Sequence, residues 1–243
     1  MAELNDLVGL VRALRPAGPT YVVAITGGVA AGKSVLATQL AEALAAVPDR
    51  PRVEVVCTDG FLFDNATLEA KGLGMRKGFP ETYDVDGFRA ALAAVRAGPA
   101  TFPGYSHTIY DIDAALARTI ESPDVLIVEG LGLHVDHGAD PAGRRLIDAL
   151  IYLDADTADI EAWFTARLVA LMLAAQDDPT SFYARFLDLD EAGRLDFAKM
   201  VWERINLPNL TQHISLARDI ADVVVRKRAD HAIEAIEGRA GRS

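Results

Sequence analysis

The chain has 243 residues, of which 51% are hydrophobic and 24% are charged, so it can bury a sizeable core and is not a disordered protein. Its 24 lysines and arginines against 35 aspartates and glutamates leave a net charge of −11, which disfavours a nucleic-acid partner because phosphate-backbone binders need a basic face. No run of about 18 apolar residues predicts a membrane span, and the N-terminus lacks a signal-peptide pattern. We therefore expect a single cytoplasmic domain over residues 1–243, in which Cys57 is a small core residue rather than a nucleophile.

Apolar periodicity predicts a first half in which strands and helices alternate. We expect a short helix at 3–15, a strand at 21–25, a helix at 33–47, a strand at 53–57, a loop around a short helix at 64–80 and a helix at 84–97. The order strand, glycine turn, helix, strand predicts an α/β fold with a mainly parallel sheet between two helical layers.

The second half is expected to continue this sheet and then to become helical. Strands are predicted at 124–129 and 149–154, helical structure from 157 to about 204 with breaks at Asp178–Pro179 and at Gly193, and a last strand at 221–225 before a polar tail. The apolar face of the helix at 157–173 suits either the core or a homodimer interface.

The strongest motif is G-x-x-x-x-G-K-S, which directly follows the first strand and opens the second helix. Such a loop turns backbone N–H groups inward at a helix N-terminus and so binds phosphates; its lysine reaches the terminal phosphates and its hydroxyl binds Mg²⁺. The predicted nucleotide-binding residues are Gly27, Gly28, Val29, Ala30, Ala31, Gly32, Lys33 and Ser34. The alternative is a glycine turn that only packs a helix on the sheet.

Two carboxylates are expected at the same edge of the sheet as this loop. Asp59 follows the second strand, where it could accept the proton of a substrate hydroxyl, or could simply end the strand in an Asp-Gly turn. Glu129 ends the strand at 124–129 and resembles the acidic residue that reaches Mg²⁺ directly or through water.

Two further segments have weaker signals. Residues Tyr105, His107 and Tyr110 lie in one loop and suit either a small-molecule pocket or a surface loop with half-buried tyrosines. Arg167, on the predicted helix, could close over phosphates or could be solvated.

The order of these motifs resembles bacterial type I pantothenate kinases, a family of P-loop kinases related to uridine kinase and phosphoribulokinase. The resemblance runs from about Tyr21 to His231 and includes Thr58–Leu62, Arg76–Asp84, Tyr105–Asp111, Leu126–Gly130, Asp177–Pro179 and Ile205–Leu210. It implies a three-layer P-loop kinase fold with a helical lid at about 157–215, and ATP- and Mg²⁺-dependent phosphorylation of a hydroxyl of pantothenate, the first step of coenzyme A synthesis.

The resemblance also implies roles for individual residues. Asp59 would be the base, with Lys33 and Arg167 as the other catalytic residues and with Ser34 and Glu129 at the metal. Residues implied on the pantothenate side are Asp59, Tyr105, His107, Tyr110, Tyr183 and Asn206, whereas Lys227 and His231 would hold adenine.

This chain departs from the family pattern at several positions. Leu168, Leu171 and Gln176 stand where phenylalanines usually wall the pantothenate pocket, and Gly132 replaces an asparagine. Thr38 replaces an arginine that helps to bind inhibitory coenzyme A. Two alternatives therefore stay open: a related kinase that acts on a nucleoside, sugar or glycerate, and a nucleotide-binding regulator or NTPase without an acceptor.

Overall fold

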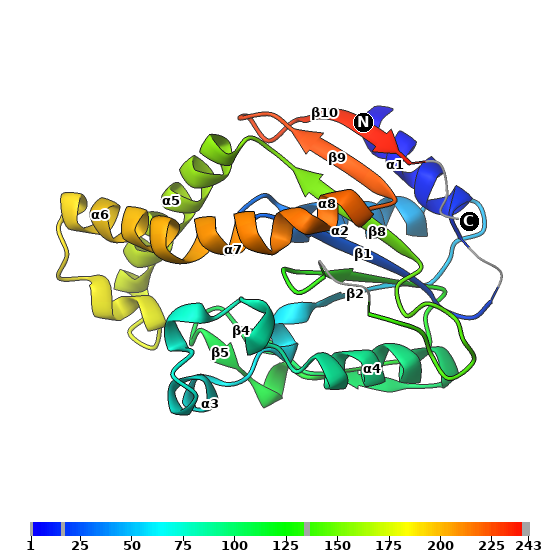
Figure 1. The fold of residues 1–243 in the computed structure, drawn as a ribbon, viewed down its shortest axis with the longest axis horizontal. Coiled ribbons are helices and arrows are strands. Elements are labelled where there is room, and N and C mark those ends of the chain that lie inside the picture. The colour runs from blue at the N-terminus through cyan, green and yellow to red at the C-terminus, as the bar shows by residue number, and fades with distance from the viewer. Residues whose placement is uncertain (1, 16–17, 134–136, 240–243) are drawn as a thin grey trace.

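The computed structural model describes residues 2–15, 18–133 and 137–239, and its centre is a six-stranded sheet. The strand order is β10-β9-β8-β1-β7-β2, and every pair is parallel except β9 with β10. The strands are β1 (Tyr21–Gly27), β2 (Val53–Cys57), β7 (Val125–Glu129), β8 (Ala149–Asp154), β9 (Val223–Lys227) and β10 (Ile233–Gly238). The predicted three-layer α/β fold is confirmed (Figure 1).

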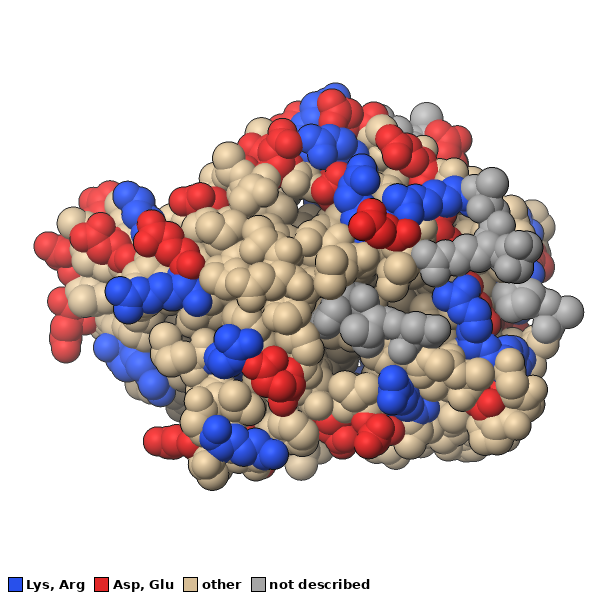
Figure 2. Space-filling view, viewed as in Figure 1, with Lys and Arg blue, Asp and Glu red and all other residues tan. Residues whose placement is uncertain are grey.

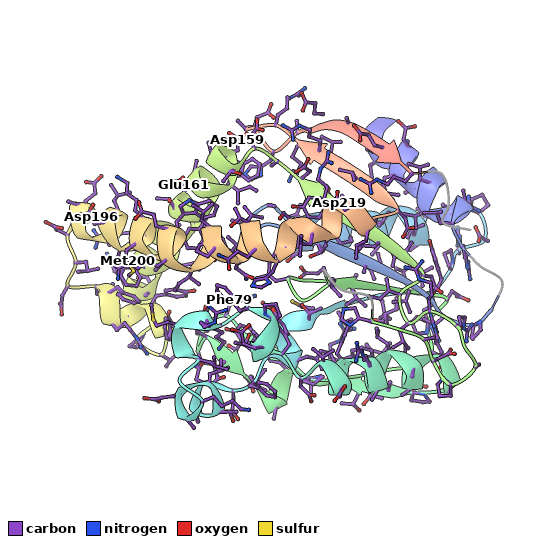
Figure 3. The ribbon with its side chains drawn as sticks, in the orientation of Figure 1. Phe79, Asp159, Glu161, Asp196, Met200 and Asp219 are labelled. Atoms are coloured by element: carbon purple, nitrogen blue, oxygen red, sulfur yellow. The ribbon has the colours of Figure 1, made fainter. Side chains whose placement is uncertain are left out.

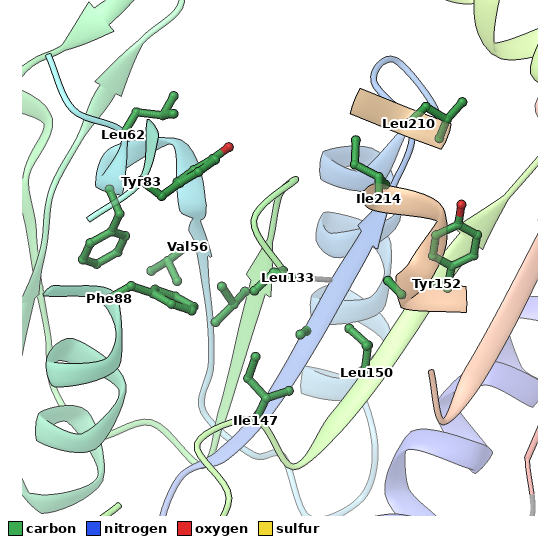
Figure 4. Packing of buried hydrophobic residues seen from close by; sticks show 14 of the residues in the cluster. Val56, Leu62, Tyr83, Phe88, Leu133, Ile147, Leu150, Tyr152, Leu210 and Ile214 are labelled. Carbon is green, nitrogen blue, oxygen red and sulfur yellow. The ribbon is translucent and has the colours of Figure 1, made fainter. Parts of the chain in front are cut away.

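Each face of the sheet has its own hydrophobic cluster, because successive residues of a strand point to opposite faces. On one face, alternate residues of β1 such as Val23 and Ile25 pack against α1 (Ala2–Ala13) and α2 (Lys33–Ala45). On the other face, Val22 and Ala24 belong to a cluster with α4 (Val85–Ala97), α5 (Thr157–Ala174) and the segments that follow α6 (Glu191–Val201). Figure 4 shows part of this second cluster, including Leu150 and Ile214.

The helical region after β8 forms one side of the molecule. A π-helical turn at Trp202–Asn206 joins α6 to α7 (Leu207–Gln212), and α8 (Ala217–Ile220) leads into β9. On α5, Ile160, Phe164, Leu168 and Met172 are buried. The apolar face of this helix, which the sequence suited to either the core or a homodimer interface, therefore packs in the core.

The segment between β2 and β7 leaves the sheet and packs against this helical region. It contains α3 (Asn65–Ala70) and two small antiparallel pairs, β3 (Ala100–Phe102) with β6 (Arg118–Ile120) and β4 (Tyr105–Ser106) with β5 (Asp111–Ile112). Phe79 is buried and meets the His213 ring edge to face at 5.8 Å, while Asn209 Nδ2 donates to the Gly78 carbonyl at 2.9 Å. Phe79 is labelled in Figure 3, below α7.

Three sequence-based expectations are wrong. The helix does not break at Gly193: α6 begins at Glu191, and the Asp190 carboxylate caps it by accepting from Gly193 N at 2.8 Å. The tail after β9 is not simply polar, because Ile233–Gly238 forms β10, whose Ile233 and Ile236 pack on the α1 side of the sheet; residues 240–243 of that tail lie outside the described part. The Tyr105–Asp111 segment is not merely a loop, since Ser106 and Asp111 pair in a hairpin.

At the amino end of the sheet, an aspartate directly before a strand binds the start of the neighbouring strand. Asp148 accepts from Val22 N at 2.8 Å, Asp222 from Leu150 N at 2.8 Å and Asp124 from Arg52 N at 2.7 Å. Asp148 also pairs with the buried Arg96 guanidinium at 2.6 Å. These bonds satisfy backbone donors at the sheet edge opposite the candidate site.

Among the described residues, no helix has both the length and the apolar character that crossing a bilayer requires. Charged side chains ring the face seen in Figure 2, with acidic and basic residues interspersed and a largely uncharged centre over α7.

Candidate active site

The glycine-rich loop lies at the carboxyl end of β1 and leads directly into α2. Gly32 is the N-cap of α2 with φ 90°, a left-handed conformation that favours glycine, and a Cβ there would lie 2.8 Å from Lys227 Nζ. Ala30 is also left-handed, at φ 58°. The Lys33 ammonium lies across the loop and donates to the carbonyls of Gly28 at 2.9 Å and Gly27 at 3.3 Å.

The predicted metal residues meet directly. Ser34 Oγ donates to Glu129 Oε1 at 2.9 Å, because the first turn of α2 faces the last residue of β7. Hydroxyl and carboxylate oxygens are ligands that Mg²⁺ accepts, usually together with phosphate oxygens and water. The pair therefore fits a magnesium ion beside the phosphate loop.

Asp59 lies beside this pair because β2 and β7 are neighbouring parallel strands in which Cys57 is opposite Glu129. Burial raises the pKa of Asp59, the Glu129 carboxylate raises it further, and His107, Lys33 and Lys77 oppose the shift. Burial lowers the pKa of Lys33, and the Glu129 and Asp59 carboxylates oppose that shift.

These groups line one cavity of about 330 Å³, which is the size of a small-molecule site. Of the residues proposed from the sequence, the cavity brings together Val29, Ala30, Lys33, Ser34, Asp59, Tyr105, His107, Tyr110, Glu129, Arg167, Leu168, Leu171, Tyr183 and Asn206. The predicted base, metal pair and acceptor residues thus share one chamber. Gln176 and Thr38 do not line it; the Thr38 hydroxyl donates to Ser34 O at 3.0 Å within α2.

The β4–β5 hairpin holds the aromatic side of the chamber. The Tyr105 ring lies 5.2 Å from the His107 ring and 6.1 Å from the Tyr110 ring, and Tyr110 lies 4.7 Å from Phe182. Phe182 N donates to the Thr108 carbonyl at 2.7 Å, which joins the hairpin to the segment after α5. The polar-aromatic segment is thus a pocket wall, one of the two alternatives open from the sequence.

For several residues of the chamber the sequence predicted no individual role, and for Lys77 it predicted only a contribution to a locally positive phosphate site. Lys77 Nζ donates to Asn65 Oδ1 at 2.6 Å and to the Tyr110 carbonyl at 2.7 Å, and it lies 4.6 Å from the Tyr110 ring centroid. Others without an assigned role are Met75, Tyr83, Leu131, Phe186, Phe197, Val201 and Ile205. Lys77 and Tyr83 lie within the Arg76–Asp84 motif, which was the available signal for them.

Cys57 also lines the chamber and is only half-buried, so it is not the core residue expected from the sequence. Its Sγ accepts a hydrogen bond from Asp59 N at 3.4 Å. Burial, followed by the Asp59 and Glu129 carboxylates, raises the pKa of the thiol and so opposes the thiolate that a nucleophile would need.

Lys227 and His231 lie outside the chamber, at the turn between β9 and β10. Lys227 Nζ donates to the phosphate-loop carbonyl of Ala31 at 3.0 Å. The His231 ring stacks on Trp163 of α5 with 4.1 Å between centroids, and Trp163 Nε1 donates to the Ala229 carbonyl at 3.0 Å. These contacts join the turn to both the phosphate loop and α5.

A phosphate-binding loop at a strand–helix junction, with carboxylates at the ends of the next two strands, defines a P-loop kinase. The family model described as the phosphoribulokinase / uridine kinase family matches residues 22–168. Among solved structures, the chain resembles a proposed fructose transport system kinase from Silicibacter sp. TM1040, at 28% identity and a TM-score of 0.66 over 90% of this chain and 94% of that one. A D-glycerate 3-kinase from Cryptococcus neoformans has the same fold, with a TM-score of 0.62 at 14% identity over 97% of this chain and 99% of that one.

Curated relatives extend this similarity to nearly the whole chain. The pantothenate kinase of Sorangium cellulosum is 41% identical over 93% of this chain and 75% of its own length, and that of Streptomyces coelicolor is 39% identical over 91% and 70%. The chain therefore belongs to the phosphoribulokinase and uridine kinase family, in its pantothenate kinase branch. It is a phosphotransferase with an alcohol group as acceptor.

Proposed function

We propose that this chain transfers the γ-phosphoryl group of Mg²⁺-bound ATP to the primary hydroxyl of pantothenate. The observation that carries the proposal is the single chamber that holds the phosphate-loop lysine, the Ser34–Glu129 pair, Asp59 and the Tyr105–Tyr110 aromatic wall. The relatives named pantothenate kinase support the choice of acceptor.

In the proposed mechanism, Asp59 accepts the proton of the acceptor hydroxyl as its oxygen bonds to the γ-phosphorus. The bond between that phosphorus and the bridging oxygen of ADP breaks on the opposite side, and ADP leaves. Lys33 and Arg167 offset the charge on the transferred group. Magnesium, held by Ser34 and Glu129, would supply further charge neutralisation at the phosphates.

On the nucleotide side, we propose that the loop residues 27–34 cradle the phosphates while Lys227 and His231 contact the adenine. The contact from Lys227 to Ala31 of the loop and the stack of His231 on Trp163 of α5 support this assignment. On the acceptor side, Tyr105, His107, Tyr110, Tyr183 and Asn206 would contact pantothenate.

A sugar acceptor is the second candidate. Leu168 and Leu171 line the chamber where the family pattern has phenylalanines, and the structural relative from Silicibacter is described as part of a fructose transport system. Smaller side chains leave more room on that wall, which would change the acceptor that fits.

An acceptor panel tests these choices. ADP release is measured with pantothenate, fructose, glycerate and a nucleoside, each at the same ATP and Mg²⁺ concentration. We expect pantothenate to stimulate release most. Stimulation by fructose alone would favour the sugar kinase, and release that no acceptor stimulates would favour an NTPase or a nucleotide-binding regulator.

Asp59→Asn tests the base directly. It should leave ATP binding nearly unchanged and lower kcat by about 100-fold or more, which is the usual scale for general-base catalysis. Asp86→Asn, which removes an exposed carboxylate on α4, is the matched control and should keep wild-type turnover. Full turnover in Asp59→Asn would show that another group takes the proton.

We also propose that the chain forms a homodimer and that it is located in the cytoplasm. A homodimer would appear in light scattering as about twice the 26.1 kDa chain mass. A cytoplasmic location follows from the proposed substrates, ATP and a small soluble acid.

A further inference from the structure

Asn209, on α7, is a buried amide that joins this helix to the wall of the chamber. It is 4% exposed, and its Nδ2 donates to the Gly78 carbonyl at 2.9 Å, whereas its Oδ1 has no hydrogen-bond partner among the described residues. A buried amide oxygen without a partner costs stability, and leucine would fill nearly the same volume without that cost. Packing therefore does not explain an asparagine here, and the bond to Gly78 is what the side chain provides.

Gly78 lines the chamber, and side chains hold both of its backbone polar groups. Its N–H donates to the buried Thr82 hydroxyl at 3.1 Å, and its carbonyl accepts from Asn209. Its φ of 93° is left-handed, a conformation that favours glycine. The orientation of this peptide therefore depends on a bond from a helix that lies 131 residues further along the chain.

Lys77 directly precedes this glycine and also lines the chamber. Its side chain is 6% exposed, and its ammonium donates to Asn65 Oδ1 at 2.6 Å and to the Tyr110 carbonyl at 2.7 Å, with Asp111 Oδ1 further away at 3.9 Å. Among the described residues these two oxygens accept its hydrogen bonds, so one of its three N–H donors is left for a molecule in the chamber.

The helix that holds Gly78 also brings Asn206 to the chamber. Asn206, the N-cap residue of α7, lies three residues before Asn209, which makes the two neighbours on the helix surface. About one turn after Asn209, the His213 ring meets Phe79, which is labelled in Figure 3. The Asn209–Gly78 bond thus joins the helix that carries Asn206 to the segment that carries Lys77.

We propose that Asn209 is a positioning residue whose bond to the Gly78 carbonyl fixes Lys77 relative to Asn206, so that both side chains bind one acceptor molecule. The inference rests on the proposed role of the chamber as the acceptor site. Holding the two groups at a fixed separation before the acceptor enters lowers the cost of ordering them on binding.

Asn209→Leu tests the inference because it removes the donor and keeps the volume. We expect KM for pantothenate to rise about fivefold or more, the scale of one hydrogen bond, while KM for ATP stays within about twofold of wild type. Asn209→Ala lacks the same donor without adding a branched side chain and should raise the same KM. An asparagine with a purely structural role would change the melting temperature and leave both KM values unchanged, which would overturn the inference.

Thr20→Val is the matched control. The Thr20 side chain is 3% exposed, and its hydroxyl donates to the Val95 carbonyl at 3.4 Å, directly before β1 and away from the chamber. The variant also removes one buried side-chain donor and keeps the volume. It should lower the melting temperature and leave the KM values for ATP and for pantothenate unchanged.

A double-mutant cycle with Lys77→Met shows whether Asn209 acts through the lysine. In the Lys77→Met background, Asn209→Leu should raise KM for pantothenate less than twofold, or its Kd by calorimetry if turnover is too low. A rise of fivefold or more in both backgrounds would show that Asn209 acts without Lys77 and would overturn the inference.

The acceptor panel separates failure of the inference from failure of the proposed function. If wild type uses pantothenate and Asn209→Leu keeps its KM, only the inference falls. If another acceptor stimulates ADP release instead, the proposed acceptor falls and the same variants are measured with that compound. If no acceptor stimulates release, the proposed function and this inference fall together.

Discussion

Lys33 and Asp59 are ionisable residues of the chamber whose pKa values burial shifts in the direction that favours the neutral form. Burial lowers the pKa of the lysine and raises the pKa of the aspartate, and each partly relieves the other. Such opposed shifts concentrate where chemistry needs groups that water would not bring together. At these two residues, the groups proposed for catalysis lower the stability of the fold.

Asp59→Asn should therefore stabilise the protein at pH 7. Folding raises the pKa of Asp59 above its unfolded value of 3.8. The folded state is therefore most stable, relative to the unfolded state, below that value, and it loses stability as pH rises through the folded pKa. Asparagine stays neutral and avoids the loss. Thermal unfolding should show a melting temperature a few degrees above wild type at pH 7, with the difference disappearing toward pH 4.

Asp64→Asn is the control with the opposite sign. The Thr67 backbone N–H lowers the pKa of Asp64, so its contribution is present above the unfolded pKa and is lost as pH falls through the lowered value. Its melting temperature at pH 7 should match or fall below wild type. A lower melting temperature of Asp59→Asn at pH 7 would contradict the expectation that the Asp59 carboxyl group destabilises the fold.

Two glycines after β7 provide a matched pair. Gly130 has φ 155°, and a Cβ there would overlap the Thr58 hydroxyl, whereas a Cβ at Gly132 would meet the Tyr83 ring at an ordinary 3.6 Å. Gly130→Ala should cost about 2 kcal/mol or more of unfolding free energy in urea, and Gly132→Ala less than about 1 kcal/mol. Equal costs would show that the backbone at Gly130 relaxes without strain.

Sequence patterns could predict the residues whose role depends on local chain geometry, and these are the phosphate loop, Asp59 and Glu129. Each lies at the carboxyl end of a strand, so the parallel sheet brings them to the same end of the sheet. Lys77, Phe197 and Val201 could not be assigned in this way. They reach the chamber from segments whose position depends on packing between distant parts of the chain.

Among the elements, α6 shows why the predicted break at Gly193 was wrong. Glycine in a helix interior is unfavourable, but here it is in the first turn, where its N–H is free to bond the Asp190 carboxylate. The strand β10 was missed because its alternation is incomplete, with a register shift between Ile233 and Ala235. In both cases a contact outside the periodic pattern decides the structure.

Asp190→Ala should destabilise α6 by about 1 kcal/mol, the usual cost of an N-cap. Since Phe197 and Val201 of α6 line the chamber, KM for the acceptor should rise while KM for ATP is unchanged. Asp188→Ala, which removes an exposed carboxylate two residues earlier, should change neither. Urea unfolding and steady-state kinetics on the two variants would show whether the cap or the charge matters.

Across the whole molecule, the carboxyl ends and the amino ends of the parallel strands have different roles. The carboxyl ends of β1, β2 and β7 carry the chamber, and the amino ends carry the aspartates that bind neighbouring strands. The net charge of −11 belongs mainly to the outer surface, where Asp159, Glu161 and Asp196 are labelled on α5 and α6 in Figure 3. Within the chamber, Lys33, Lys77 and Arg167 provide local positive charge.

Asp148→Ala tests this separation. It leaves the Arg96 guanidinium buried with the Arg145 carbonyl and, among the described carboxylates, the more distant Asp140 at 3.7 Å, and should cost about 3–5 kcal/mol in urea. Asp124→Ala removes a comparable bond at an exposed position and should cost about 1 kcal/mol. Below their melting temperatures both variants should keep wild-type kcat, and a loss of turnover in either would show that the two ends are coupled.

The helix α5 has a consequence for how the substrate range of this protein could change. Trp163, Arg167 and Leu171 are four residues apart, so they lie on successive turns, about 6 Å apart along the axis. Trp163 contacts the β9–β10 turn, whereas Arg167 and Leu171 line the chamber, with proposed roles at the phosphates and at the acceptor wall. Mutations at the last turn can alter acceptor choice and leave the arginine one turn earlier in place. With these proposed roles, selection can act on donor and acceptor recognition separately within a single helix.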